Sequence, residues 1–196
     1  MFSRLTKLGL VAAVSATAQF ISATAQSNES SNDPVYVFNR ICYAQVPNIQ
    51  GIRNMALQLA WKQMGGEDLA RFTKLKDPKV LEGWDAQVGE RLFRVGVVQS
   101  DVPPAMQARF PDFAKGVSTS CSIVLDEEHK ADAVAKNMQA LAGKEPVSRD
   151  VADGDLLTTT WAGGNAEFKV FLVAKLSSDG AGGLLNVTIL SKESGS

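Results

Sequence analysis

The two cysteines of this 196-residue chain, Cys42 and Cys121, restrict its fold more than any other feature. An even pair of cysteines in an oxidising compartment most often forms a disulfide. Such a bond would close a loop of about 80 residues, for which the chain-entropy relation gives about 4–5 kcal/mol of stabilisation. The competing interpretation is a thiol pair for metal or redox chemistry. Because there is no Cys-x-x-Cys spacing and His129 is the only histidine, the sequence favours the disulfide and predicts neither a metal site nor a cofactor.

The first 25 residues have the organisation of a secretory signal peptide. Arg4 and Lys7 form a basic start, residues 8–14 are apolar, and Ala23-Thr24-Ala25 provides a cleavage site of small residues. Cleavage after Ala18 is an alternative, although a cut after Ala25 leaves a longer apolar stretch. A permanent anchor needs about 20 predominantly apolar residues, and polar side chains interrupt this segment. We therefore expect a periplasmic or secreted protein with no stable membrane insertion after cleavage.

The remaining chain divides into a short tail and one domain. Residues 26–33 are polar and rich in serine and asparagine, which predicts a disordered tail. Residues 34–192 suit a single globular domain with a sizeable core. The formal net charge is −1, and loss of Arg4 and Lys7 leaves 18 basic and 21 acidic side chains. Without a block of basic residues, nucleic acid and anionic membranes are not expected as partners.

Helical signals dominate the first part of the domain. Asp33 followed by Pro34 predicts the start of a helix over residues 35–44, since proline fits a first helical turn. Asn48 is the predicted N-cap of a second helix over 49–64, in which apolar side chains recur at helical spacing. A helical turn over 67–72 is expected after the two glycines that end this helix.

Strand signals begin at Leu81, where apolar and polar residues alternate with a period of two. This alternation predicts a hairpin with its turn at Gly89-Glu90. Further strands are expected at 117–125, 156–161, 167–176 and 183–190, with the turns of the last three at Gly163-Gly164-Asn165 and Asp179-Gly180.

Two segments interrupt this series of strands. Three prolines predict an irregular connection over residues 101–116. Asp126 is the predicted cap of a third helix, which has one apolar face and stops at Gly143.

The expected fold is α+β, with a single antiparallel sheet of about six strands. Short turns between neighbouring strands favour antiparallel pairing. The N-terminal helices and one further helix would pack on one face of the sheet. A bond between Cys42 and Cys121 would then fasten the first helix onto the third strand.

Candidate functional residues are few. Trp61, Trp84 and Trp161 are candidates for an aromatic surface that binds sugar or peptide, although tryptophan more often packs in a core. We expect Trp61, which lies off the main apolar stripe of its helix, to be partly exposed. His129 is interpreted as a solvated residue in the first turn of the third helix rather than a general base. The sequence assigns no catalytic residue.

Part of the chain resembles a known group of proteins. The signal peptide together with the segments 37–47, 157–164 and 183–190 is similar to an uncharacterised family of small exported proteins from Gram-negative bacteria. The resemblance implies export to the periplasm and a two-cysteine domain. It implies no catalytic residue.

These observations favour a non-enzymatic exported domain that binds an envelope or extracellular protein, or another envelope component. Two alternatives remain open. One is an envelope hydrolase that uses carboxylates. The other is a carrier that holds a small apolar ligand between helices and sheet.

Export predicts a change of mass. When the full chain is expressed with its N-terminus intact in a Gram-negative host, intact-mass analysis of the exported protein should show loss of residues 1–25. A product that retains the full-length mass would contradict the signal peptide.

Overall fold

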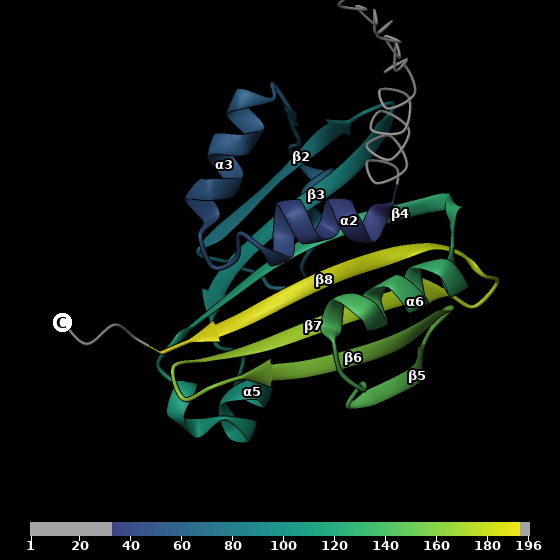
Figure 1. Cartoon of the computed structure of the whole chain (residues 1–196). Helices are drawn as coiled ribbons and strands as arrows, with labels where there is room; N and C mark the ends of the chain where they lie inside the picture. The colour runs from purple at the N-terminus through teal and green to yellow at the C-terminus, as the bar shows by residue number, and fades with distance from the viewer. Residues whose placement is uncertain (1–32, 193–196) are drawn as a thin grey trace, which may run out of the picture.

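The computed structural model describes residues 33–192, apart from the side chains of Glu127 and Glu128, and it has an α+β fold (Figure 1). The helical segments are α2 (Pro34–Phe38), the π-helix η1 (Asn39–Tyr43), α3 (Ile49–Gln58), α4 (Glu67–Ala70), α5 (Pro104–Arg109), the 3-10 helix η2 (Pro111–Phe113) and α6 (Ala131–Ala142). The strands are β1 (Lys62–Gln63), β2 (Val80–Val88), β3 (Arg91–Asp101), β4 (Val117–Lys130), β5 (Ser148–Asp153), β6 (Leu156–Gly164), β7 (Phe168–Ser177) and β8 (Ala181–Ser191).

All strands of residues 33–192 belong to one antiparallel sheet, as expected, but this sheet has eight strands rather than about six. Their order is β1-β2-β3-β4-β8-β7-β6-β5. The two additional strands are the edges. β1 has only two residues, and β5 is mostly exposed, so neither carries the alternation of buried and exposed residues that reveals a strand in sequence.

The strand order divides the sheet into two similar halves. Helix α3 is followed by the meander β1–β4, and helix α6 is followed by the meander β5–β8. The last strands of the two meanders, β4 and β8, pair in the centre. The sequence shows no internal repeat, so this symmetry is one of topology alone.

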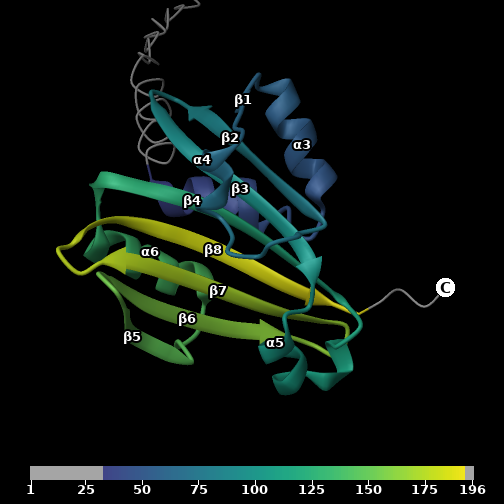
Figure 2. The same ribbon diagram turned by 180° about the vertical axis from the view of Figure 1, so that it is seen from behind.

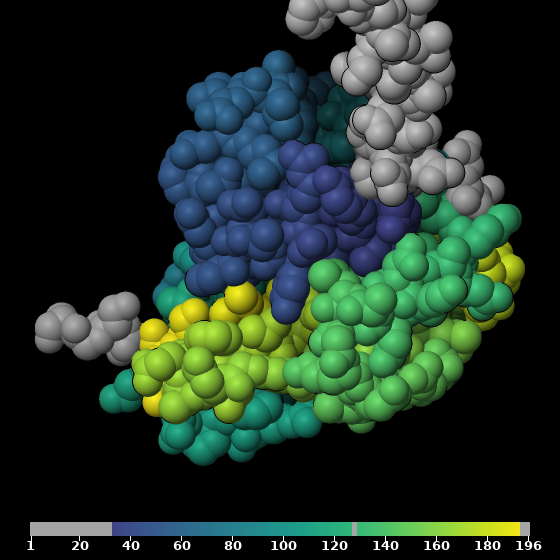
Figure 3. Space-filling model, in the orientation of Figure 1, coloured from purple at the N-terminus to yellow at the C-terminus, as the bar shows by residue number. Residues whose placement is uncertain are grey.

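One face of the sheet, here called the helix side, carries the main core. Phe93, Val95, Ile123, Leu185 and Val187 are among its fully covered side chains. The segments α2, η1, α3 and α6 cover this face, and Figure 3 shows them in front of the sheet. Burial of this apolar surface is the main source of stability for the layered arrangement.

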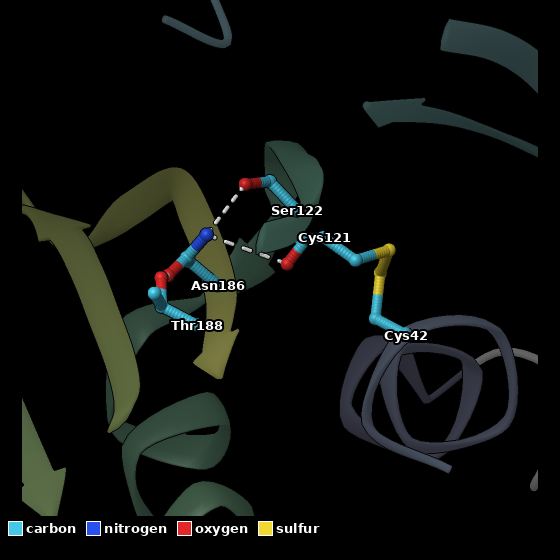
Figure 4. The surroundings of a disulfide bond; sticks show 5 residues. All are labelled: Cys42, Cys121, Ser122, Asn186 and Thr188. Atoms are coloured by element: carbon cyan, nitrogen blue, oxygen red, sulfur yellow. Dashed lines mark hydrogen bonds between the residues drawn. A yellow bond between two sulfur atoms is a disulfide. The ribbon is translucent and has the colours of Figure 1, made fainter. Parts of the chain in front are cut away.

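The Cys42–Cys121 disulfide is present and joins η1 to β4 (Figure 4). The two Cα atoms are 5.2 Å apart and both side chains are fully buried. This confirms the cysteine pairing and the attachment of the first helical segment to that strand. The start of this segment is also as expected, because the Asp33 side chain accepts a hydrogen bond from the Val35 N–H at 2.9 Å.

The second helix begins at the predicted cap but ends six residues early, at Gln58 instead of Met64. The Asn48 side chain caps it by accepting from the Gly51 N–H at 3.1 Å. At its other end Ala60 has a left-handed φ of 51°, and the Trp61 N–H donates to the Ala56 carbonyl at 2.9 Å. This turn reverses the chain, so that Trp61 packs inward and β1 begins.

A bidentate ion pair also fixes α3 to the sheet. The Arg53 guanidinium donates to both carboxylate oxygens of Glu82 on β2, at 2.8 and 2.6 Å. Hydrogen bonding to Glu82 raises the pKa of Arg53.

The expected irregular connection over 101–116 is wrong in part, because it contains α5 and η2. Pro104 and Pro111 each stand at the first position of one of these helices. Proline lacks an N–H but needs none in a first turn, so it starts a helix as readily as it breaks one. The prolines therefore mark two short helices on the other face of the sheet, here called the back side.

The third helix also starts later than expected. β4 continues to Lys130 and α6 begins at Ala131, so Asp126 is a strand residue and not a helix cap. His129 accordingly lies at the end of β4 and is buried, with 6 % of its surface exposed. The expectation of a solvated histidine is wrong.

The signal peptide, residues 1–25, and residues 26–32 of the tail lie outside the described part of the chain. Within residues 33–192, no helix is both long and apolar enough to cross a membrane.

The disulfide should contribute strongly to stability. In the Cys42→Ser/Cys121→Ser double variant, the free energy of unfolding should fall by about 4–5 kcal/mol, because the unfolded chain regains the entropy of an open loop. Urea denaturation of both proteins measures the difference. Equal stability of the variant and the oxidised wild type would contradict this role.

Candidate ligand groove on the back side of the sheet

The three candidate tryptophans belong to the core. Trp61 is 8 % exposed, Trp84 6 % and Trp161 2 %. The expected partial exposure of Trp61 is therefore wrong. Trp61 and Trp84 both line one surface hollow. Trp161 lines a different hollow, beside the turn at 163–165. The fold thus does not join the three rings into one binding surface.

Trp161 has a clear packing role. Its indole N–H donates to the side-chain oxygen of Gln139 on α6, at 3.1 Å. The bond fastens α6 to β6 and satisfies the polar atom of a buried ring.

His129 belongs to a small polar cluster at the end of β4. Its Nδ1 lies 2.7 Å from Oδ1 of Asp126, and the Arg91 guanidinium lies 3.6 Å from the same oxygen. The ring packs beside Phe93, with centroids 5.8 Å apart. The cluster ties the start of β3 to the junction of β4 and α6.

The back side of the sheet differs from the helix side in its chemistry. Side chains alternate along a strand, so the residues between the core positions of β4 point to the back. They are Ser118, Ser120 and Ser122. The register places Ser120 opposite Thr188 and Ser122 opposite Asn186 on β8. The central strands therefore present a row of hydroxyl and amide groups behind the core.

These groups form one hydrogen-bonded network. Asn186 donates from its amide nitrogen to Ser122 Oγ at 2.9 Å, and its amide oxygen accepts from Thr188 Oγ1 at 3.0 Å. The Ser120 and Thr188 hydroxyls lie 2.7 Å apart. Asn186 also approaches the carbonyl of Cys121 at 3.4 Å, on the other side of β4 from the disulfide (Figure 4). The network fixes the rotamers of these side chains.

One side of this row is covered by the segment between α4 and β2. Phe72, Thr73 and Leu75 lie there. Gly96 of β3 permits the contact, because a Cβ at this position would collide with the Phe72 ring. Position 96 therefore requires glycine, because the Phe72 side chain approaches the backbone closely.

The other side is covered by α5 and η2. Val102, Phe113, Phe171 and Leu190 form a second, smaller core beneath them. Figure 2 shows α4 and α5 on this face, with β4, β8 and β7 passing between them.

The space between these two covers is a groove of about 460 Å³. Its floor contains four residues of the polar row, Ser118, Ser120, Asn186 and Thr188, together with Thr160 and Val173, and its walls are largely apolar. Ser122 is buried and bonds to Asn186 from outside the groove. The volume lies within the ~300–1,000 Å³ typical of small-molecule sites. Arg109 at the end of α5 is the one charged side chain among the lining residues of this groove. The arrangement suits binding of an organic molecule by apolar contact, with a few fixed polar groups to orient it.

Sequence reasoning identified the strands of the groove but missed the groove. The available signal was the alternation of serine with Thr119, Cys121 and Ile123 along β4, which places every second residue on a face opposite the disulfide. The covers come from the 72–75 segment and α5, and no pattern in the sequence links either of them to β4.

Neither a protein-family model, nor a curated protein, nor a solved structure matches this chain.

The network predicts a cost for removing its central amide. Asn186→Ala removes the side-chain partner of Ser122 and one of the two partners of the Thr188 hydroxyl, which keeps its bond to Ser120. It should lower the free energy of unfolding by about 1–3 kcal/mol. Urea denaturation measures the change. Asn54→Ala on α3, where the amide is exposed, is the control and should change stability by less than about 0.5 kcal/mol. Equal effects of the two substitutions would mean that the network does not order the groove floor.

Proposed function

We propose that this protein is a non-enzymatic binding domain and that its ligand is a small organic molecule held in the back-side groove. The observation that carries the proposal is the polar row that forms the groove floor between two apolar covers. Fixed polar groups inside an apolar concavity are the usual composition of a ligand site.

The groove floor is ordered before a ligand arrives. Its hydroxyl and amide groups bond to one another, and β4 beneath them is fastened from the other side by the disulfide. Binding would therefore cost little conformational entropy, because side chains that are already fixed need not be immobilised.

The site of action in this proposal is the periplasm or the outside of the cell. The disulfide supports it, because such bonds are more typical of exported proteins and other oxidising compartments. The ligand would then be a component of the envelope or of the surrounding medium.

The position of the groove distinguishes this proposal from the carrier considered in the sequence analysis. That carrier was expected to use the space between helices and sheet, which side chains of the main core occupy. The groove lies on the opposite face, and its lining combines apolar and polar side chains. Its lining residues include no carboxylate or histidine, so the groove offers no support to a carboxylate-based hydrolase.

Filling the groove should abolish binding. Val173 lies on its floor, opposite Asn186 in the register, and Val173→Trp would place an indole in the space a ligand needs. Saturation-transfer NMR with a mixed library of small anions, cations and neutral compounds should detect ligands of the wild type. The variant should weaken their binding by at least about tenfold, which corresponds to ~1.4 kcal/mol.

Two further variants make this experiment decisive. Val151→Trp introduces the same residue on the exposed edge strand β5 and should retain binding. Thr160→Trp fills the groove from β6 and replaces Val173→Trp if thermal unfolding shows that the latter is not folded. The proposal fails if the library yields no ligand, or if its ligands bind the filled and unfilled proteins equally.

A further inference from the structure

Three cationic side chains contact the aromatic rings of α5, η2 and the residue between them, in a chain with a formal net charge of −1. The Arg109 guanidinium lies 5.4 Å from the centroid of the Phe110 ring. Nearby, the ammonium groups of Lys169 and Lys192 lie 5.8 and 5.7 Å from the Phe113 ring. Phe110 and Phe113 flank the same turn, so three cations surround the short helices that close one side of the groove.

Arg109 is held at the groove by contacts with aromatic rings. Its guanidinium lies over Phe110, whose ring in turn packs on Phe171 of β7 with centroids 5.6 Å apart. Phe171 and Arg109 both line the groove. These contacts direct an otherwise flexible side chain to the margin of the groove, and contact with an aromatic face is compatible with its charge.

The three cations form no ion pair with any carboxylate that the structure describes in residues 33–192, which leaves aside Glu127 and Glu128. Asp112 and Glu167, which lie close in the chain, are not paired with them, and Asp101 is paired with Lys79 at 2.6 Å. Of the three, Arg109 lines the groove and places a positive charge at its α5 end.

The remainder of the groove suits an apolar body. Phe72 and Leu75 line the cover on the far side, and Val98 and Met106 add further apolar surface. The hydroxyls of Ser120 and Thr188 are bonded within their own network. Both hydroxyls therefore keep their hydrogen-bond partners when an apolar chain covers them.

We propose, on the basis of the proposed function, that the ligand is an amphiphilic organic anion. Its acidic group is held by Arg109, and its apolar chain lies along the groove toward Phe72. The occupant is a free small acid rather than a membrane surface, because a bounded groove of about 460 Å³ accommodates a single chain.

A series of ligands that differ only in the head group tests this inference. Decanoate, decanol and decylamine carry the same chain with an anionic, a neutral and a cationic head. Titration calorimetry with the exported protein should give the tightest binding for decanoate and the weakest for decylamine. The preference for decanoate should decrease as salt is added, because salt screens the attraction between the carboxylate and the exposed Arg109.

Arg109→Gln removes the charge and keeps most of the side chain. We expect it to weaken decanoate binding by about three- to tenfold, the size of one partly exposed charge contact, and to leave decanol binding unchanged. Arg149→Gln on β5 is the matched control, since Arg149 is an exposed arginine whose ion pair is with Glu145. It should change neither affinity.

The outcomes separate the two proposals. Equal affinities for decanoate and decanol, both abolished by Val173→Trp, would overturn the anion inference and leave the groove as a ligand site. Binding to anionic phospholipid vesicles without binding of decanoate would also overturn it. If decanoate binds but Val173→Trp has no effect, the acid does not occupy the groove and both proposals fail for this ligand.

Discussion

The structure depends on strand β4, which is fixed from both faces. On the helix side Cys121 is bonded to Cys42 of η1, so the N-terminal helices cannot separate from the sheet while the bond is intact. On the back side Ser120 and Ser122 are bonded to Thr188 and Asn186 of β8. Consecutive residues of one strand thus attach the helical layer and order the groove floor. This coupling follows from the alternation of side chains in an extended chain.

The pairing of β4 with β8 also explains why the groove is central. Each strand is the last of a four-stranded meander, and antiparallel pairing of the two joins both halves into one sheet. The covers of the groove come from the connections within the first half, where the chain leaves α4 and where it passes from β3 to β4. Their aromatic side chains, Phe72 and Phe110, pack back onto the sheet. A hollow remains where the two covers do not meet.

The N-terminal cap at Asp33, the cap at Asn48 and the 89–90 turn could be predicted because short-range hydrogen bonding and backbone preferences determine them. The early end of α3 could not be predicted. Its left-handed residue is Ala60, and alanine, unlike glycine, does not indicate a left-handed conformation in the sequence. Burial of Trp61 decides that conformation, and the contacts of Trp61 are distant in the sequence. The burial of His129 could not be predicted either, because it depends on the continuation of β4 to Lys130, which places His129 beside Asp126.

The sequence by itself determined the fold class, the cysteine pair and the strand periodicity, because each depends on residue type and local spacing. It left the groove undetermined. No pattern in the sequence connects its lining residues Ser120, Thr188, Phe72 and Arg109. Only the strand register and the two covers bring them together. The tertiary structure decided this because a concavity is produced by segments far apart in the chain, whose relative positions no local pattern specifies.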